Sequence, residues 1–181
     1  MIVLICCLAA IGQTADNLYK EGKALYDAKD YGKAVAKLKV AAEKGHKKAQ
    51  YRLGVCYEKG RGVDENDVVA AKWYAKAAAQ DHAKAQYQLG QCYKDGTGVA
   101  KDRKKAVALF AKAARQDYAP AQYQLGKAYL KGKGIAADVS KARQWLKKAV
   151  KNEKDGDEIL AKIKKQAAEG DEDARKILKL L

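Results

Sequence analysis

The sequence predicts an all-α fold, a solenoid of antiparallel helix pairs, from three observations. A fifteen-residue motif occurs at residues 49–63, 85–99 and 121–135, and its middle copy reads AQYQLGQCYKDGTGV. The copies start 36 residues apart, a period typical of repeat proteins in which each unit is one supersecondary element. Hydrophobic residues make up 48% of the 181-residue chain, many are alanine, and there is a single proline, which favours closely packed helices. Each motif also contains a Gly-x-Gly segment, which predicts a break between two helices.

The period divides the chain into successive units. We expect these at residues 13–48, 49–84, 85–120, 121–152 and 153–181. The first unit is a shorter form, because Gly22 and Ala41 are 19 residues apart whereas their counterparts Gly54 and Ala77 are 23 apart. We therefore place four additional residues of each later unit in its Gly-x-Gly turn.

The second helix of each full unit is also in register. Short polar residues recur where it should begin, and predict N-caps: Asn66, Asp102 and Asp138. Its large apolar residues are Trp73, Leu109 and Trp145. We expect one glycine of each Gly-x-Gly pair to have a positive φ. From residue 153 the pattern decays into helices at 157–168 and from 171 onward, as expected of a unit that caps an open stack.

The N-terminal segment predicts export. Residues 1–12 carry no charged side chain, are too short to cross a bilayer, which takes ~20 residues, and fit the apolar region of a signal peptide. Cleavage is expected before Gln13, or as late as after Ala15, giving a periplasmic or secreted protein without a transmembrane helix. No lysine or arginine precedes the apolar run, which counts against this interpretation. A buried N-terminal helix and a misassigned start are the alternatives.

The charge of the chain bears on its partners. Lys and Arg number 37 against 22 Asp and Glu, a formal net charge of +15, and most of the excess is lysine. Because lysine is a hydrated point charge, this predicts attraction to acidic surfaces more than specific nucleic-acid recognition. Two interpretations follow: an acidic protein or peptide partner, or an anionic polymer or surface such as cell wall, nucleic acid or acidic lipid.

A search for catalytic chemistry finds no constellation that would carry it. After the predicted leader, the only serine is Ser140, placed within a helix. His46 and His82 share one repeat phase at turns between units and lack further ligands at metal-binding spacing. We interpret Cys56 and Cys92 as small buried residues rather than as a redox pair. The sequence therefore predicts no catalytic residue, no metal, no cofactor and no enzyme.

The pattern Ala-x-x-x-Leu-Gly-x-x-Tyr-x-x-Gly-x-Gly-Val resembles that of Sel-one-like repeats, the longer relatives of tetratricopeptide repeats. The resemblance is strong over residues 49–151, tetratricopeptide-like over 16–48 and weak over 153–181. It implies a right-handed superhelix whose first helices line a concave face. It also implies a non-catalytic scaffold or adaptor, in some relatives an inhibitor of a secreted effector. Hydrolase activity has been attributed to family members, but no residue here supports it.

The first helices supply the candidate partner-binding residues. Tyrosine and arginine are prominent at protein interfaces, and polar or basic residues accompany the tyrosines. The candidates are Tyr19, Lys20, Lys23, Tyr51, Arg52, Val55, Tyr87, Gln88, Gln91, Lys94, Tyr123, Gln124 and Lys127. Two roles fit Tyr19, Tyr51, Tyr87 and Tyr123 equally well: they could line a binding groove, or they could pack between successive repeats. A second series, Tyr57, Tyr93 and Tyr129, we assign to the core.

Overall fold

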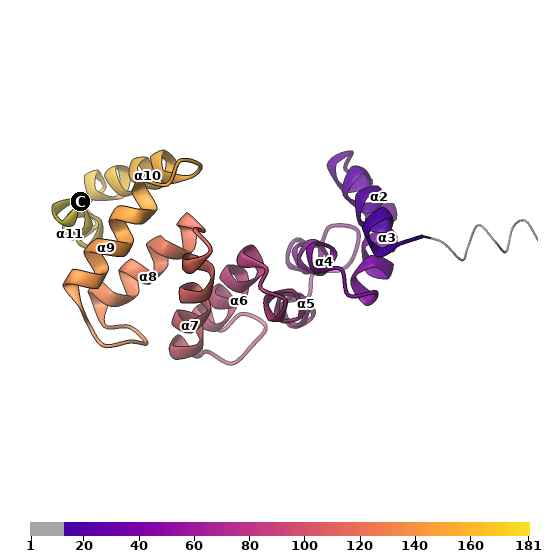
Figure 1. Ribbon diagram of the computed structural model, residues 1–181, viewed down its shortest axis with the longest axis horizontal. Helices are drawn as coiled ribbons and strands as arrows, with labels where there is room; N and C mark the ends of the chain where they lie inside the picture. The colour runs from indigo at the N-terminus through magenta and orange to yellow at the C-terminus, as the bar shows by residue number, and fades with distance from the viewer. Residues whose placement is uncertain (1–12) are drawn as a thin grey trace, which may run out of the picture. The chain divides into compact units, whose positions relative to one another are not determined.

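The computed structural model describes residues 13–181, and over that range it contains ten α-helices and no strand (Figure 1). The predicted all-α fold of antiparallel helix pairs is thereby confirmed. The predicted signal peptide at residues 1–12 lies outside the described range. Between residues 13 and 181, none of the helices has the length and apolar content needed to cross a membrane.

The chain forms two compact units, which meet in sequence between His82 and Ala83. Unit 1 contains α2 (Ala15–Asp27), α3 (Tyr31–Glu43), α4 (Lys47–Lys59) and α5 (Asp67–Ala79). Unit 2 contains α6 (Ala83–Asp95), α7 (Arg103–Arg115), α8 (Ala119–Lys131), α9 (Val139–Val150), α10 (Gly156–Ala168) and α11 (Glu172–Leu180). Within each unit, every helix packs against its neighbour in sequence.

The second helices begin where short polar side chains predicted. The side-chain oxygens of Asn66, Asp102 and Asp138 accept the backbone N–H three residues later, at 3.0, 3.0 and 2.9 Å. Each satisfies a helix N–H that has no partner within the helix. The three N-caps are therefore confirmed, and they hold α5, α7 and α9 in the same register within their pairs.

The Gly-x-Gly turns differ from the expectation of one positive φ in each pair. Both glycines have positive φ in all three turns. The first glycine ends the preceding helix in a left-handed conformation, as Gly60 does after α4 with φ 60°. The second lies against backbone: a Cβ on Gly62 would be 2.3 Å from the Tyr31 carbonyl oxygen, and one on Gly134 would be 2.4 Å from that of Arg103. The second glycine is therefore needed for a further reason: its backbone lies so close to the start of the preceding second helix that a side chain would not fit.

The glycine within each first helix makes room for a large side chain of its partner. An ideal Cβ on Gly54 would lie 2.6 Å from Tyr74 Cε1, and one on Gly90 would lie 2.6 Å from Phe110 Cε1. Leu146 occupies the same place against Gly126 in the third full repeat. These three side chains are at most 2% exposed.

The positions assigned to the large apolar residues of the second helices therefore need a correction. Trp73, Leu109 and Trp145 are only half-buried, and the residue after each is the buried one. One helical residue corresponds to a rotation of about 100°, so the tryptophans lie at the edge of the helix contact instead of at its centre.

Two other expectations about the core hold only in part. The tyrosine series Tyr57, Tyr93 and Tyr129 is half-buried, packed against the edge of the core. Cys56 is fully buried, as expected, whereas Cys92 is half-buried.

The last two helices close the C-terminal end of unit 2. Ile163 of α10 and Ile177 of α11 are fully buried in one cluster with Leu146 of α9. The decayed repeat pattern thus still covers the apolar face of the preceding pair, as a capping element does.

Candidate partner-binding face

Tyr19 and Tyr51 of unit 1 each stack on the histidine that precedes the first helix of the following pair in sequence. The rings of Tyr19 and His46 stack with centroids 4.4 Å apart, and those of Tyr51 and His82 stack at 4.9 Å. Burial raises the pKa of Tyr51 above its usual value. Both tyrosine rings are half-buried, so each offers a partner only part of its surface.

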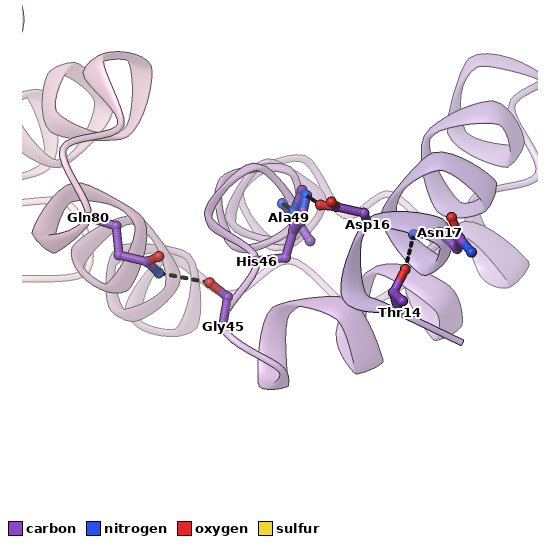
Figure 2. A network of polar contacts seen from close by, with 7 residues as sticks. All are labelled: Thr14, Asp16, Asn17, Gly45, His46, Ala49 and Gln80. Carbon is purple, nitrogen blue, oxygen red and sulfur yellow. Dashed lines mark hydrogen bonds and ion pairs between the residues drawn. The ribbon is translucent and has the colours of Figure 1, made fainter. Parts of the chain in front are cut away.

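His46 is more than the turn residue that the sequence predicts. Figure 2 shows it between Asp16 and the backbone of Ala49. Its Nδ1 accepts the Ala49 N–H at 3.1 Å, and its Nε2 lies 2.9 Å from Asp16 Oδ1. An imidazole whose Nδ1 accepts a hydrogen bond carries its proton on Nε2, from which it donates to the carboxylate. The side chain thus caps α4 and ties it to α2.

In unit 2 the tyrosines at the same phase, Tyr87 and Tyr123, are half-buried and buried, respectively. The Tyr87 ring packs against Phe110 at 5.8 Å and edge-on against Tyr118 at 5.3 Å between centroids. Burial raises the pKa of Tyr87, and likewise that of Tyr123, which is only 7% exposed. At these two positions, most of the aromatic surface is used in packing between helices.

The polar candidates of unit 1 are mostly engaged on the unit itself. Arg52 lies over the Tyr26 ring, 4.7 Å from its centroid, and Arg61 donates to the Tyr26 hydroxyl. Lys23 forms an ion pair with Asp27 one turn away. Lys20 is exposed and Val55 is half-buried. Arg52 therefore makes a cation–π contact with Tyr26 within unit 1.

In unit 2, by contrast, the structure brings several candidates together. Lys94 Nζ donates to Gln91 Oε1 at 2.7 Å, and Gln91 Nε2 donates to the Tyr87 hydroxyl at 3.0 Å. Lys94, Gln124 and Lys127 line one pocket with a volume of about 210 Å³. Gln88 is half-buried on the same helix as Lys94. We call the pocket and this chain of polar contacts the α6/α8 face.

Sequence reasoning missed three further cations at this pocket. Arg103, Lys131 and Lys133 complete its lining, above apolar side chains that include Val107 and Phe110. Arg103 is the first residue of α7, and the two lysines flank the glycine that ends α8. The only sequence signal was their position beside the Gly-x-Gly turn, which does not reveal that the α7 start and the α8 end meet.

The electrostatics of the α6/α8 face favour an anionic ligand. Burial lowers the pKa of Lys127, and the nearby charges of Lys131 and Lys94 lower it further, against the opposing effect of Asp171 and Asp173. Asp173 forms its ion pair with Lys131. No carboxylate lines the pocket, so a carboxylate brought by a partner would meet an excess of positive charge.

The described part of the chain also contains candidate metal ligands and a buried thiol. Over residues 13–181, no three His, Cys, Asp or Glu side chains are grouped so that they could hold a metal ion. The Cys56 thiol is fully buried, and burial raises its pKa to about 11, which leaves it protonated at neutral pH.

Comparison with known proteins identifies the repeats. A family model described as Sel1 repeat matches residues 47–82, 83–118 and 119–153, more than half of the chain. A solved Sel1 repeat protein from Oxalobacter formigenes is 31% identical, with a TM-score of 0.72, covering 86% of this chain and 72% of that one. The protective antigen c5321 of uropathogenic Escherichia coli, with an SLR fold, is 32% identical, with a TM-score of 0.76 and coverage of 84% of this chain.

These relatives are mostly longer than the region that they share with this chain. The match covers 33% of c5321. A rat protein described as DAP3-binding cell death enhancer 1 is 46% identical over 50 residues, which are 28% of this chain and 10% of the rat protein. The chain therefore matches about a tenth of that protein's length.

Proposed function

The chain belongs to the Sel1 repeat family, and on that premise we propose that it is a non-catalytic interaction module whose α6/α8 face binds a protein or peptide with acidic side chains. Helical repeats of this kind present extended surfaces suited to protein binding. The candidate residues of unit 1 are proposed as a separate contact region, which includes the exposed Lys20.

One observation carries the proposal. The pocket of the α6/α8 face is lined by five cationic side chains and no carboxylate, around a partly apolar interior: Lys94, Arg103, Lys127, Lys131 and Lys133. Charge complementarity of this kind accelerates association and selects partners. The apolar floor, which includes Val107, adds a contact for the side chain next to the acidic residue. An acidic segment with an adjacent apolar residue fits both features.

The proposal includes export. Its support is the uncharged apolar run at residues 1–12, and mass spectrometry of the mature N-terminus tests it. A mature protein beginning at Gln13 or just after Ala15 is expected, and retention of residues 1–12 would contradict export. Inhibition of a secreted effector is one form that binding by an exported module would take.

The test of partner binding uses charge removal with a matched control. Lys94→Gln with Lys127→Gln alters the α6/α8 face, and Lys112→Gln with Lys162→Gln removes two exposed charges elsewhere. Proteins captured from an exported fraction would be identified and then titrated against both variants. We expect the face variant to bind at least about tenfold more weakly than the control variant, since two charge contacts are lost.

Two outcomes would count against the proposal. Equal affinity of the face variant and the control variant would remove the α6/α8 face from the interface. Equal weakening of both, with a steep loss of affinity as salt is raised, would favour binding to an anionic polymer through the net charge of the chain.

A further inference from the structure

Unit 2 contains a second cleft, apart from the α6/α8 face. It has a volume of about 1250 Å³ and lies where the ends of α7 and α9 meet the start of α8. It shares no lining residue with the pocket of the α6/α8 face. Its volume exceeds that of a typical small-molecule pocket, so a longer ligand suits it better.

The cleft lies at a place where a repeated hydrogen-bond pattern fails. In unit 1 the buried Gln50 donates to the Ala42 carbonyl at 3.0 Å, and its Oε1 accepts from Gln80 Nε2 at 2.8 Å. The next repeat has the same amide pair, in which Gln116 Nε2 donates to Gln86 Oε1 at 2.8 Å. Each pair joins residues 30 positions apart and satisfies an amide oxygen in the interior.

In the third repeat the equivalent of Gln80 and Gln116 is Asn152, one methylene shorter. Its Nδ2 donates to the backbone and side-chain oxygens of Asp117, each at 3.2 Å, instead of reaching Gln122. Gln122 is 1% exposed and lines the cleft, and its Oε1 has no hydrogen-bond partner among residues 13–181. A buried carbonyl left without a donor is costly, so a rotation of the Gln122 side chain that brings this enclosed atom to an N–H of a ligand would be favourable.

The charge and shape of the cleft indicate which ligand would bring that N–H. Its cationic side chains outnumber its carboxylates by six to three, with Lys147, Lys148 and Lys151 along α9 and the turn after it. Lys148 Nζ lies 5.0 Å from the centre of the Trp145 ring, which also lines the cleft and is half-buried. A lysine row beside an aromatic ring suits acidic side chains that alternate with apolar ones.

We infer that this cleft binds an extended acidic peptide segment. One backbone N–H of the peptide donates to Gln122 Oε1, its carboxylates pair with Lys147 and Lys151, and an apolar side chain contacts Trp145. The inference is independent of the α6/α8 face, because the two sites use different residues.

The experiment measures fluorescence anisotropy of a labelled peptide with alternating glutamate and alanine, eight residues long and blocked at both ends. Lys147→Glu with Lys151→Glu should weaken binding at least tenfold. Lys162→Glu with Lys164→Glu, the same charge change on exposed positions of α10, should leave it within twofold. Circular dichroism confirms that each variant is folded.

A scan of single N-methylated peptide bonds tests the Gln122 contact without altering the protein. One methylation position should reduce affinity far more than its neighbours. If no position stands out, a water molecule satisfies Gln122 and the assigned hydrogen bond is wrong. If binding of the peptide is lost with Lys94→Gln and Lys127→Gln but kept with Lys147→Glu and Lys151→Glu, the peptide occupies the α6/α8 face. The inference about the cleft is then overturned, while the proposed function stands.

Discussion

The His46 ring stacks on Tyr19 at 4.4 Å between centroids while its Nδ1 accepts the backbone N–H of Ala49. One side chain thus performs two tasks, closing the contact between successive helix pairs and capping α4. At the corresponding position before α8 the residue is Tyr118, which makes an aromatic contact with Tyr87 but no side-chain cap. His46 and Tyr118 thus both make a contact with a tyrosine ring, but only the imidazole of His46 also caps its helix.

Separating these two tasks gives a first prediction. His46→Asn keeps a capping acceptor and removes the ring, whereas His46→Ala removes both. Loss of an N-cap costs about 1 kcal/mol, so the alanine variant should be less stable than the asparagine variant by about that amount. Urea unfolding followed by circular dichroism measures the difference. Equal stability of the two variants would show that the Ala49 hydrogen bond contributes nothing.

Two glycines of unit 1 should respond to alanine in opposite ways. A Cβ on Gly54 would lie 2.6 Å from the Tyr74 ring, so Gly54→Ala should destabilise the protein by about 1–3 kcal/mol. Gly32, in the first turn of α3, has nothing within 4 Å of an added Cβ. Gly32→Ala should be neutral or stabilise by up to about 1 kcal/mol. Thermal unfolding of the pair checks this, and a harmless Gly54→Ala would contradict the tight contact.

The amide pair between Gln80 and Gln50 predicts a cost for shortening one side chain. Gln80→Asn should leave the buried Gln50 Oε1 without its donor and lower the free energy of unfolding by about 1–2 kcal/mol. Gln144→Asn, the same change at an exposed helical position, should stay within about 0.5 kcal/mol. Denaturant titration of both variants compares them. An equal effect at the two sites would mean that the amide pair adds no stability.

The Cys56 thiol predicts a dependence of stability on alkaline pH. Burial raises its pKa from 9.0 to about 11, so the folded state keeps a proton that the unfolded state loses. Its contribution to stability is complete below pH 9 and is lost as the pH rises towards 11. Cys56→Ala should abolish this component, so the stability difference between the two proteins should change over that interval. A constant difference from pH 8 to 11 would contradict the shift.

Local features of the chain could be predicted because each depends on a few adjacent residues. The period of the motif, the N-caps at Asn66, Asp102 and Asp138, and the breaks at the Gly-x-Gly turns all follow from local conformational preferences. The helical C-terminal cap was also predicted from residues close in sequence. The family resemblance, carried by the same local residues, was confirmed by the three matched repeats.

The tertiary structure decided how the side chains of those helices are used. It placed Tyr74 instead of Trp73 in the core, because one residue of helix rotation separates the centre of a contact from its edge. It placed Arg103 and Lys127 in the lining of one pocket, and it left Gln122 without the donor that Gln80 supplies to Gln50. Sequence alone determined which helices form and where they end. Contacts between residues about 30 positions apart determined which side chains remain available to a partner, since such contacts exist only after the helices have packed.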